Sequence, residues 1–259
     1  MKESSVDLYF FSGTGNTLLA ARAVAEGLRA GGKSVRLLRL EKGISAPAGD
    51  TALGVAVTTA CFSTYPFVWE ALEQLPSGEG RSAFAISTMG GYSGGLRSPL
   101  RKLLHKKGYR TLGYAEFVMP SNYANKSIPQ EANREKIQKC EAKAREFALA
   151  LLEDRATWRS GGPFSPFFNW MARKKAPWRM MKRSFPLEID KSRCIQCGKC
   201  ARLCPAKNIV MEEYPRFLDH CVVCQRCIAF CPPAAIGVHG KKYEQYRAVE
   251  YDTLVSDKL

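Results

Sequence analysis

Eight of the ten cysteines in this 259-residue chain lie between Cys194 and Cys231, in two copies of one pattern. The copies read CIQCGKCARLCP over residues 194–205 and CVVCQRCIAFCP over residues 221–232, and both follow C-x2-C-x2-C-x3-C-P. The N-terminal sequence has no apolar stretch typical of a secretion signal, so we expect these thiols to bind metal instead of forming disulfides. A segment this small has little apolar core, and metal binding must supply much of its folding free energy.

The cysteine spacing predicts two 4Fe-4S clusters. Three thiolates at two-residue intervals can wrap one face of a cubane cluster, and the fourth, turned away at the proline, binds the other cluster. The predicted ligands are Cys194, Cys197, Cys200 and Cys231 for cluster one, and Cys204, Cys221, Cys224 and Cys227 for cluster two. Zinc is the alternative, but a zinc site needs four ligands and has no use for the third cysteine of each triplet.

The repetition extends beyond the cysteines. LEID and RFLD precede the two copies, and NIVM and AIGV follow them. Each half therefore predicts a strand, a cluster loop with a helical turn and a second strand, in a small α+β domain. Residues 187–239 resemble the bacterial two-cluster ferredoxins. Four basic residues lie among the ligands, either solvated or offsetting cluster charge: Lys199, Arg202, Lys207 and Arg226.

The first 154 residues alternate between expected strands and expected helices. Apolar runs predict strands at 6–11, 34–40, 52–59, 82–89 and 112–119, and helices at about 15–28, 67–75, 96–108 and 130–154. Such alternation implies parallel βαβ units with right-handed crossovers. The third to fifth expected strands lack a polar face, as in a sheet covered on both sides. We therefore predict an α/β fold with a doubly wound, five-stranded parallel sheet.

The stretch FFSGTGNT joins the first expected strand to the first expected helix. A helix N-terminus at the carboxyl end of a sheet is an anion site, because its backbone N–H groups are free. The loop has no lysine, as a Walker A loop requires, and Leu18 stands where G-x-G-x-x-G needs its third glycine. A lysine-free cradle of this kind predicts a terminal monophosphate, with a plain strand–helix turn as the alternative. Its residues are Ser12, Gly13, Thr14, Gly15, Asn16 and Thr17.

Two further loops, TTACFSTYP (58–66) and STMGGYSGG (87–95), end on the same edge of the expected sheet. Open α/β sheets bind ligands beyond this edge. Both loops combine small residues with aromatic rings that suit a flat ligand. Cys61 lies in the first loop, and we expect it to be inert because no neighbour in sequence lowers its pKa. We expect the same of Cys140 in the last helix.

A strand ending in S-x-T-G-N-T, with these two loops, resembles the flavodoxin family over residues 4–154. The resemblance implies FMN, with its phosphate in the loop 12–17 and with Tyr65 and Tyr92 as candidates to stack on the flavin ring. Flavodoxins tend to be acidic, whereas residues 1–154 carry 20 basic against 15 acidic residues, which argues against a standard flavodoxin partner. The ring-side residues that the resemblance implies are Thr59, Ala60, Cys61, Phe62, Tyr65, Thr88, Met89, Gly90, Gly91, Tyr92, Gly94 and Gly95.

The chain's net charge of +15 is concentrated in residues 155–185, which have eight basic residues and no acidic one. A nucleic-acid-binding face would instead spread such charge over a domain. The segment also contains three of the four tryptophans. Three roles are open for it: packing against both domains, a homodimer surface, or a patch for a membrane surface or an acidic partner.

The sequence thus divides into a flavodoxin-like FMN domain (1–154), a basic aromatic linker (155–185), a two-cluster ferredoxin-like domain (186–240) and a tail (241–259). This order resembles the flavodoxin–ferredoxin fusion proteins found widely in anaerobes. It implies electron transfer between FMN and two 4Fe-4S clusters. The alternative is an FMN-dependent reductase of a quinone or another small acceptor, supplied with electrons through the clusters.

We expect a redox partner, either a ferredoxin or another acidic protein, and a second copy of this chain as a further candidate. Nucleic acid is not expected. The sequence has no uncharged apolar run of 18 residues, so we predict a cytoplasmic protein without a transmembrane segment.

Overall fold

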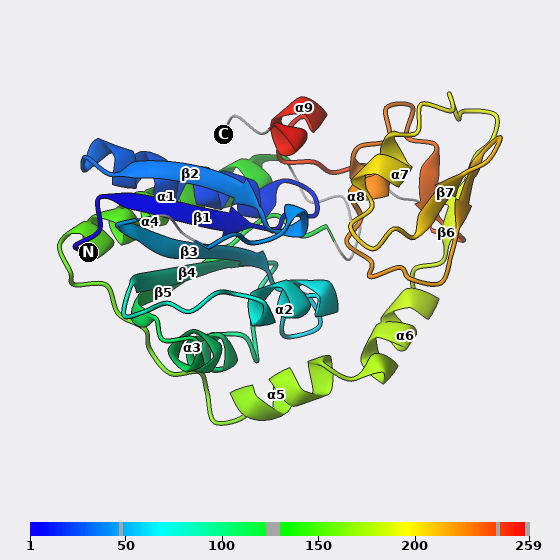
Figure 1. Cartoon of the computed structure of the whole chain (residues 1–259). Helices are drawn as coiled ribbons and strands as arrows, with labels where there is room; N and C mark the ends of the chain where they lie inside the picture. Colours follow the sequence, from blue (N-terminus) through cyan, green and yellow to red (C-terminus); the bar gives the residue numbers. More distant parts are fainter. Residues whose placement is uncertain (47–48, 123–129, 242–243, 257–259) are drawn as a thin grey trace.

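The computed structural model describes residues 1–46, 49–122, 130–241 and 244–256. Its first domain is built on a five-stranded parallel sheet (Figure 1). The strands are β1 (Ser5–Phe10), β2 (Ser34–Arg39), β3 (Thr51–Thr58), β4 (Ser82–Met89) and β5 (Arg110–Val118). Their order is β2-β1-β3-β4-β5, and all neighbours are parallel. This is the flavodoxin-like order of a doubly wound sheet, and it confirms the predicted fold.

Helices cover both faces of the sheet because successive strand side chains point to opposite faces. Leu8 and Phe84 face one helical layer, while Tyr9 and Val55 face the other. The first layer is α1 (Asn16–Ala30) and α4 (Gln130–Leu152), and the second is α2 (Pro66–Glu73) and α3 (Arg97–Lys106). A 3-10 turn, η1 (Leu40–Lys42), follows β2.

The second domain consists of short elements around the cysteine copies. They are β6 (Leu187–Ile189), α7 (Lys199–Leu203), β7 (Ile209–Met211), β8 (Pro215–Phe217), α8 (Arg226–Ala229) and β9 (Ile236–Val238). β6 pairs with β9 and β7 with β8, both antiparallel. The four short strands fall where the repeated sequence predicts them, and each cysteine copy contributes one helical turn.

The two cysteine copies share one backbone conformation. Both have left-handed residues at the same three positions, although only one of the six is glycine. The matched pairs are Gln196 (φ 54°) and Val223 (57°), Gly198 (68°) and Gln225 (64°), and Lys207 (50°) and Ala234 (49°). Non-glycine residues adopt this region at an energetic cost, which the surrounding structure must offset. Its recurrence at equivalent positions indicates one loop geometry built twice.

Two helices of the linker, α5 (Ser165–Ala172) and α6 (Lys175–Arg183), run between the domains (Figure 1). Trp158 and Trp178 are buried in a core cluster of the first domain, and Phe185 is buried in the core of the second. The linker thus packs against both domains, although Phe167 and Trp170 remain exposed. Within the part of the chain that the structure describes, no helix has the length and apolar character needed to cross a membrane.

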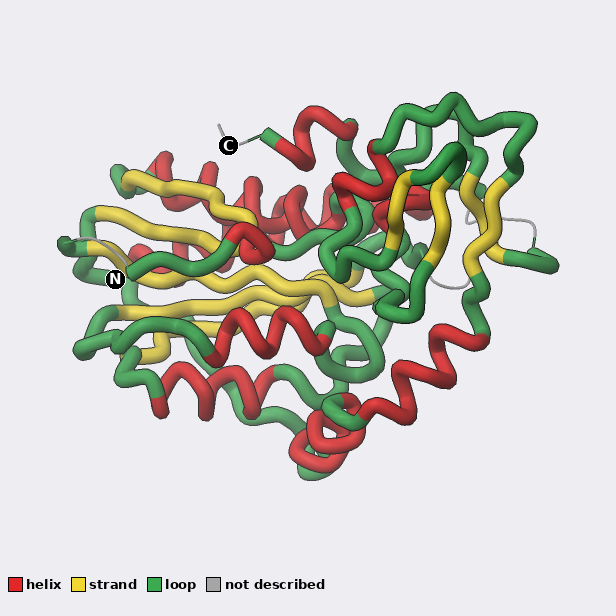
Figure 2. Tube along the Cα trace, turned by 45° about the vertical axis from the view of Figure 1, so that its right-hand side comes forward, coloured by secondary structure: helices red, strands yellow, loops and turns green. Residues whose placement is uncertain are grey.

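The second domain faces the carboxyl ends of the strands (Figures 1 and 2), and one arginine crosses the contact. Arg226 is only 3% exposed. Its Nε donates a hydrogen bond of 2.8 Å to the Ser12 carbonyl, and its Nη1 lies 2.7 Å from Glu41 Oε1. The guanidinium also lies 4.5 Å from the centre of the Phe11 ring. The sequence left the role of Arg226 open, and the structure makes it a buried ion-pair partner across the domains.

Replacing Arg226 with methionine should destabilise the protein far more than the equivalent change in the other copy. Arg226→Met leaves the Glu41 carboxylate buried and unpaired, which costs about 3–5 kcal/mol. Lys199→Met, at the matched position, removes a cation–π contact with Tyr251, worth about 0.5–1 kcal/mol. Urea unfolding of the anaerobic full-length protein measures both. Equal losses in the two variants would contradict the role assigned to Arg226.

Candidate functional site

A polar cavity lies beyond the carboxyl ends of β1, β3, β4 and β5. It adjoins the topological switch point between β1 and β3, where doubly wound sheets bind ligands. Its walls are made mainly of hydroxyl, amide and backbone groups. The lining residues are Ser12, Gly13, Thr14, Asn16, Thr58, Thr59, Tyr65, Thr88, Met89, Gly90, Met119, Pro120, Ser121 and Asn122.

Four of the six residues predicted to hold phosphate line this cavity. The Ser12 hydroxyl accepts a hydrogen bond of 3.1 Å from the Gly15 N–H, which shapes the turn. Thr14 Oγ1 accepts a hydrogen bond of 2.9 Å from Asn122 Nδ2. Because this contact occupies an acceptor site of the oxygen, the Thr14 hydroxyl hydrogen can donate to a ligand.

The other two residues of this loop face elsewhere. Gly15, at φ +101°, lies against Val249, and a Cβ there would come within 2.8 Å of the valine side chain. Thr17 Oγ1 lies 2.8 Å from Thr58 Oγ1 and 2.7 Å from Thr88 Oγ1. Instead of pointing into the cavity as predicted, the Thr17 hydroxyl joins the ends of β3 and β4 to the start of α1.

Eight of the twelve predicted ring-side residues line one of two neighbouring spaces. Thr59, Tyr65, Thr88, Met89 and Gly90 line the polar cavity. Gly91, Tyr92 and Gly94 line a neighbouring hollow, which shares Met89 with the cavity. Tyr65 is buried and Tyr92 is 64% exposed, so the two stacking candidates do not face one space.

A tight turn explains why Ala60, Cys61 and Phe62 are absent from the cavity wall. Ala60 and Ser63 exchange two backbone hydrogen bonds of 2.9 Å, and both residues between them are left-handed. The Phe62 ring consequently packs on Phe168 of α5, with ring centres 5.2 Å apart. Gly95 also faces α5, where a Cβ would overlap the Asn169 nitrogen. Burial raises the pKa of the Cys61 thiol, which agrees with the predicted inertness.

Five lining residues were missed by the sequence reasoning: Thr58, Met119, Pro120, Ser121 and Asn122. The last four follow β5, whose carboxyl end lies on the same edge as those of β3 and β4. The rule that led to the loops after β3 and β4 applies equally to the Ser–Asn pair after β5. This signal was present in the sequence.

The residues present fit a ligand with a phosphate and a flat ring. The Thr59 Oγ1 atom is buried and has no hydrogen-bond partner among the described residues. A buried hydroxyl without a hydrogen-bond partner destabilises the protein, and a ligand or a water molecule can supply that partner. Thr14 and Thr59 therefore offer hydroxyl groups to a ligand, whereas the Asn16 amide already bonds the Pro120 carbonyl and the Tyr246 hydroxyl. Tyr65 and Met89 offer apolar surface.

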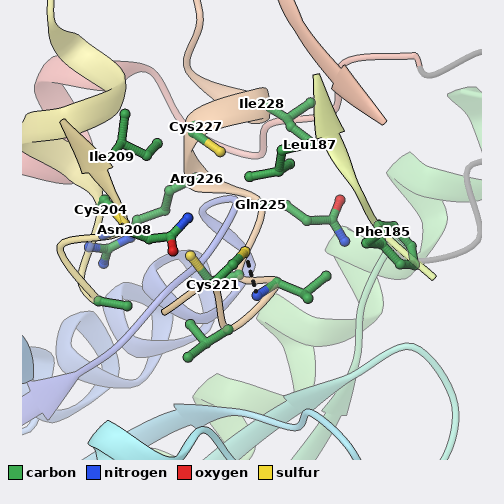
Figure 3. Close-up of a pocket in the computed structure, with 14 residues that line it drawn as sticks. Phe185, Leu187, Cys204, Asn208, Ile209, Cys221, Gln225, Arg226, Cys227 and Ile228 are labelled. Carbon is green, nitrogen blue, oxygen red and sulfur yellow. Dashed lines mark hydrogen bonds between the residues drawn. The ribbon is translucent and has the colours of Figure 1, made fainter. Parts of the chain in front are cut away.

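Two further cavities in the second domain are each surrounded by four cysteines. Cys204, Cys221, Cys224 and Cys227 line the first (Figure 3). The second is lined by Cys194, Cys197, Cys200 and Cys231. These are the two groups predicted from the spacing, and each combines a triplet from one copy with the last cysteine of the other. All eight are free thiols.

Each group of four cysteines is arranged around one cavity. The thiolates of a cubane bind different irons, so they lie farther apart than the ligands of one zinc. Burial raises the pKa of the Cys224 thiol to about 12, and metal binding must displace its proton.

Backbone N–H groups also point at the sulfurs, at equivalent places in both copies. The Asn208 N–H donates to Cys204 Sγ at 3.1 Å, and the Ala235 N–H donates to Cys231 Sγ at 3.2 Å. Hydrogen bonds to ligand sulfurs are among the factors that set the reduction potential of a cluster.

Comparison with known proteins finds one family model and several solved structures similar to parts of the chain. Residues 187–210 match the family model of the 4Fe-4S binding domain. A flavodoxin from the domain Archaea is 14% identical, with 57% of this chain and 98% of that chain covered and a TM-score of 0.39. Flavodoxin 1 from Bacillus cereus is 16% identical, with 60% and 100% covered and a TM-score of 0.39. No curated protein matches. The strand order, not these likenesses, defines the fold of the first domain.

The contacts of Thr17 predict a structural role for its hydroxyl. Thr17→Val should lower the free energy of unfolding by about 1–3 kcal/mol, because the buried Thr88 hydroxyl and the half-buried Thr58 hydroxyl each lose a partner. Thr111→Val is the matched control, since its hydroxyl bonds His105 on an exposed part of the surface, and should change stability by no more than about 0.5 kcal/mol. Urea unfolding measures both. A Thr17→Val protein as stable as the wild type would contradict this role.

Proposed function

We propose that this chain, which joins a flavodoxin-like domain to a 4Fe-4S domain, transfers electrons between FMN and two 4Fe-4S clusters. The observation that carries the proposal is the pair of four-cysteine cavities in a domain packed against the rim of the polar cavity. FMN supplies chemistry that exchanges two electrons singly, and each cubane accepts one. A protein holding all three converts between two-electron and one-electron carriers.

The FMN proposal is supported by the place and chemistry of the polar cavity. In sheets of this strand order, the switch point between β1 and β3 is where FMN binds. The loop after β1 supplies the Thr14 hydroxyl and backbone N–H groups for the phosphate, and Asn122 orients that hydroxyl. Tyr65 and Met89 line the same cavity and offer apolar surface for the ring.

The proposal of two clusters is supported by the repeated geometry. Each four-cysteine cavity draws ligands from both copies, so each cluster would join the two halves of the domain. The left-handed residues recur beside equivalent ligands, and so do the hydrogen bonds to sulfur. A domain with a single cluster would need these features in one copy only.

One observation favours the second candidate, an FMN-dependent reductase. The hollow beside the polar cavity shares Met89 with it and contains Tyr92, together with the ion pair of Arg97 and Glu116. A small acceptor could occupy this hollow next to the flavin ring. Tyr65 is a poor proton donor for such a reaction, because burial raises its pKa and leaves it far from solvent. Steady-state reduction of a quinone, lost in Tyr92→Phe, would favour the reductase.

The cofactor content is the first test of electron transfer. Protein purified without oxygen should contain one FMN, about eight irons and about eight acid-labile sulfides per chain. Iron and sulfide analysis, metal analysis and the flavin spectrum measure these quantities. Zinc in place of iron, or a chain without flavin, would overturn the proposal.

The Thr14 hydroxyl provides a second test, directed at the phosphate. Thr14→Ala removes one hydrogen bond to a charged group, worth about 1.5–3 kcal/mol, and should weaken FMN binding by about one to two orders of magnitude. Riboflavin lacks the phosphate and should bind wild type and variant alike. Titration of the flavin-free protein with both flavins measures the difference. Equal weakening of the two would mean that the substitution acts on the fold and not on a phosphate contact.

A further inference from the structure

The two cysteine copies share a backbone, but their surroundings differ. In the second copy, every residue from Val223 to Cys231 is buried. In the first copy, Leu203 is the only buried residue between Cys194 and Cys204, and Ile195 is 63% exposed. Sequence repetition alone gives no reason for this asymmetry. Part of the second copy packs against the first domain, through Cys224, Ala229 and Phe230. The rest packs in the core of the second domain, whereas only Leu203 of the first copy joins a core cluster of the first domain.

The second copy contacts the wall of the polar cavity directly. Gly13 lines that cavity, and a Cβ on Gly13 would overlap the carbonyl oxygen of Cys224. Tyr65 lines it too and shares one buried cluster with Cys224. Cys224 is a predicted ligand of cluster two. A single residue, Gly13, therefore lies between a cluster ligand and the space proposed for FMN.

The arginine between the ligands Cys224 and Cys227 holds this contact in place. Arg226 bonds the Ser12 carbonyl, next to Gly13, and pairs with Glu41. The equivalent residue of the first copy, Lys199, stacks on Tyr251 of the C-terminal segment instead. Arg226 is therefore a positioning residue that fixes the second cysteine copy to the loop after β1, and its Nη1 also donates a hydrogen bond of 3.4 Å to the Leu203 carbonyl of the first copy.

We propose that cluster two, held by Cys204, Cys221, Cys224 and Cys227, exchanges electrons directly with FMN, and that cluster one, held by Cys194, Cys197, Cys200 and Cys231, exchanges them with other proteins. The proposal rests on the proposed function and adds an order to it. In this order, the four cysteines of cluster two would receive both electrons of reduced FMN one at a time, and the first would move on to cluster one before the second arrives. FMN would be oxidised, each cluster would be reduced by one electron, and the protons of reduced FMN would go to solvent. Electrons from a one-electron carrier protein follow the reverse order.

A matched pair of double variants tests the order. Cys194→Ala/Cys197→Ala removes ligands of cluster one, and Cys221→Ala/Cys224→Ala removes the ligands at equivalent positions of cluster two. The backbone carbonyl at position 224 remains in the second variant. Iron analysis should give about four irons in each. Pulsed electron paramagnetic resonance then measures how fast one-electron-reduced FMN relaxes, because a nearby reduced cluster accelerates that relaxation with a steep dependence on distance.

Fast relaxation should persist in Cys194→Ala/Cys197→Ala and be lost in Cys221→Ala/Cys224→Ala. The reverse result would overturn the order, and so would equal effects of the two pairs. Failure of the proposed function looks different, because the wild type would then lack FMN or iron, or would show no acceleration of relaxation by its reduced clusters.

A further experiment uses the wild-type protein, so its result does not depend on whether the variants fold. A water-soluble iron chelator should remove the exposed cluster one first, until about half of the iron is lost. The flavin in this half-depleted protein should still relax fast. Loss of the acceleration at this stage would mean that the exposed cluster is the one beside the flavin, and would overturn the proposal.

Discussion

The buried guanidinium of Arg226 determines how the two domains meet. It sits between two cysteines of the second copy, and it reaches a backbone carbonyl, a carboxylate and an aromatic ring of the first domain. A charge at this depth is stable only with such partners, so the domains cannot separate without exposing it or leaving it unpaired. The relative positions of the loop after β1 and of the second cysteine copy follow from this contact.

The C-terminal segment strengthens the same contact from the other side of the loop. The Ala248 N–H donates to the Thr14 carbonyl at 2.7 Å, and the Tyr246 hydroxyl donates to Asn16 Oδ1 at 2.7 Å. The loop after β1 is therefore held by groups more than 200 residues away in sequence. In a sheet that stood alone, the same loop would face water, and its conformation would depend on its ligand.

Local patterns predicted the elements and the two groups of four cysteines that line the cavities, and long-range contacts decided the rest. The strands could be predicted because parallel, doubly covered strands are continuous apolar runs, and the cysteine groups because the two copies have the same spacing. The orientation of Thr17 could not be predicted, since it depends on how β3 and β4 align beside α1. The different roles of Lys199 and Arg226 could not be predicted either. The two residues occupy the same position of the repeated motif, and they differ in the groups that pack against them.

The buried tryptophans of the linker have a consequence for kinetics. Trp158 and Trp178 anchor the segment between the domains into the first domain's core, so the second domain is not a tethered body that must dock anew for each transfer. Tethered partners react at a rate set by their effective concentration, and docking between charged surfaces slows as salt screens them. For the proposed transfer between FMN and the clusters, this packing would remove the encounter step, and the rate would depend on fixed distances and not on viscosity or ionic strength.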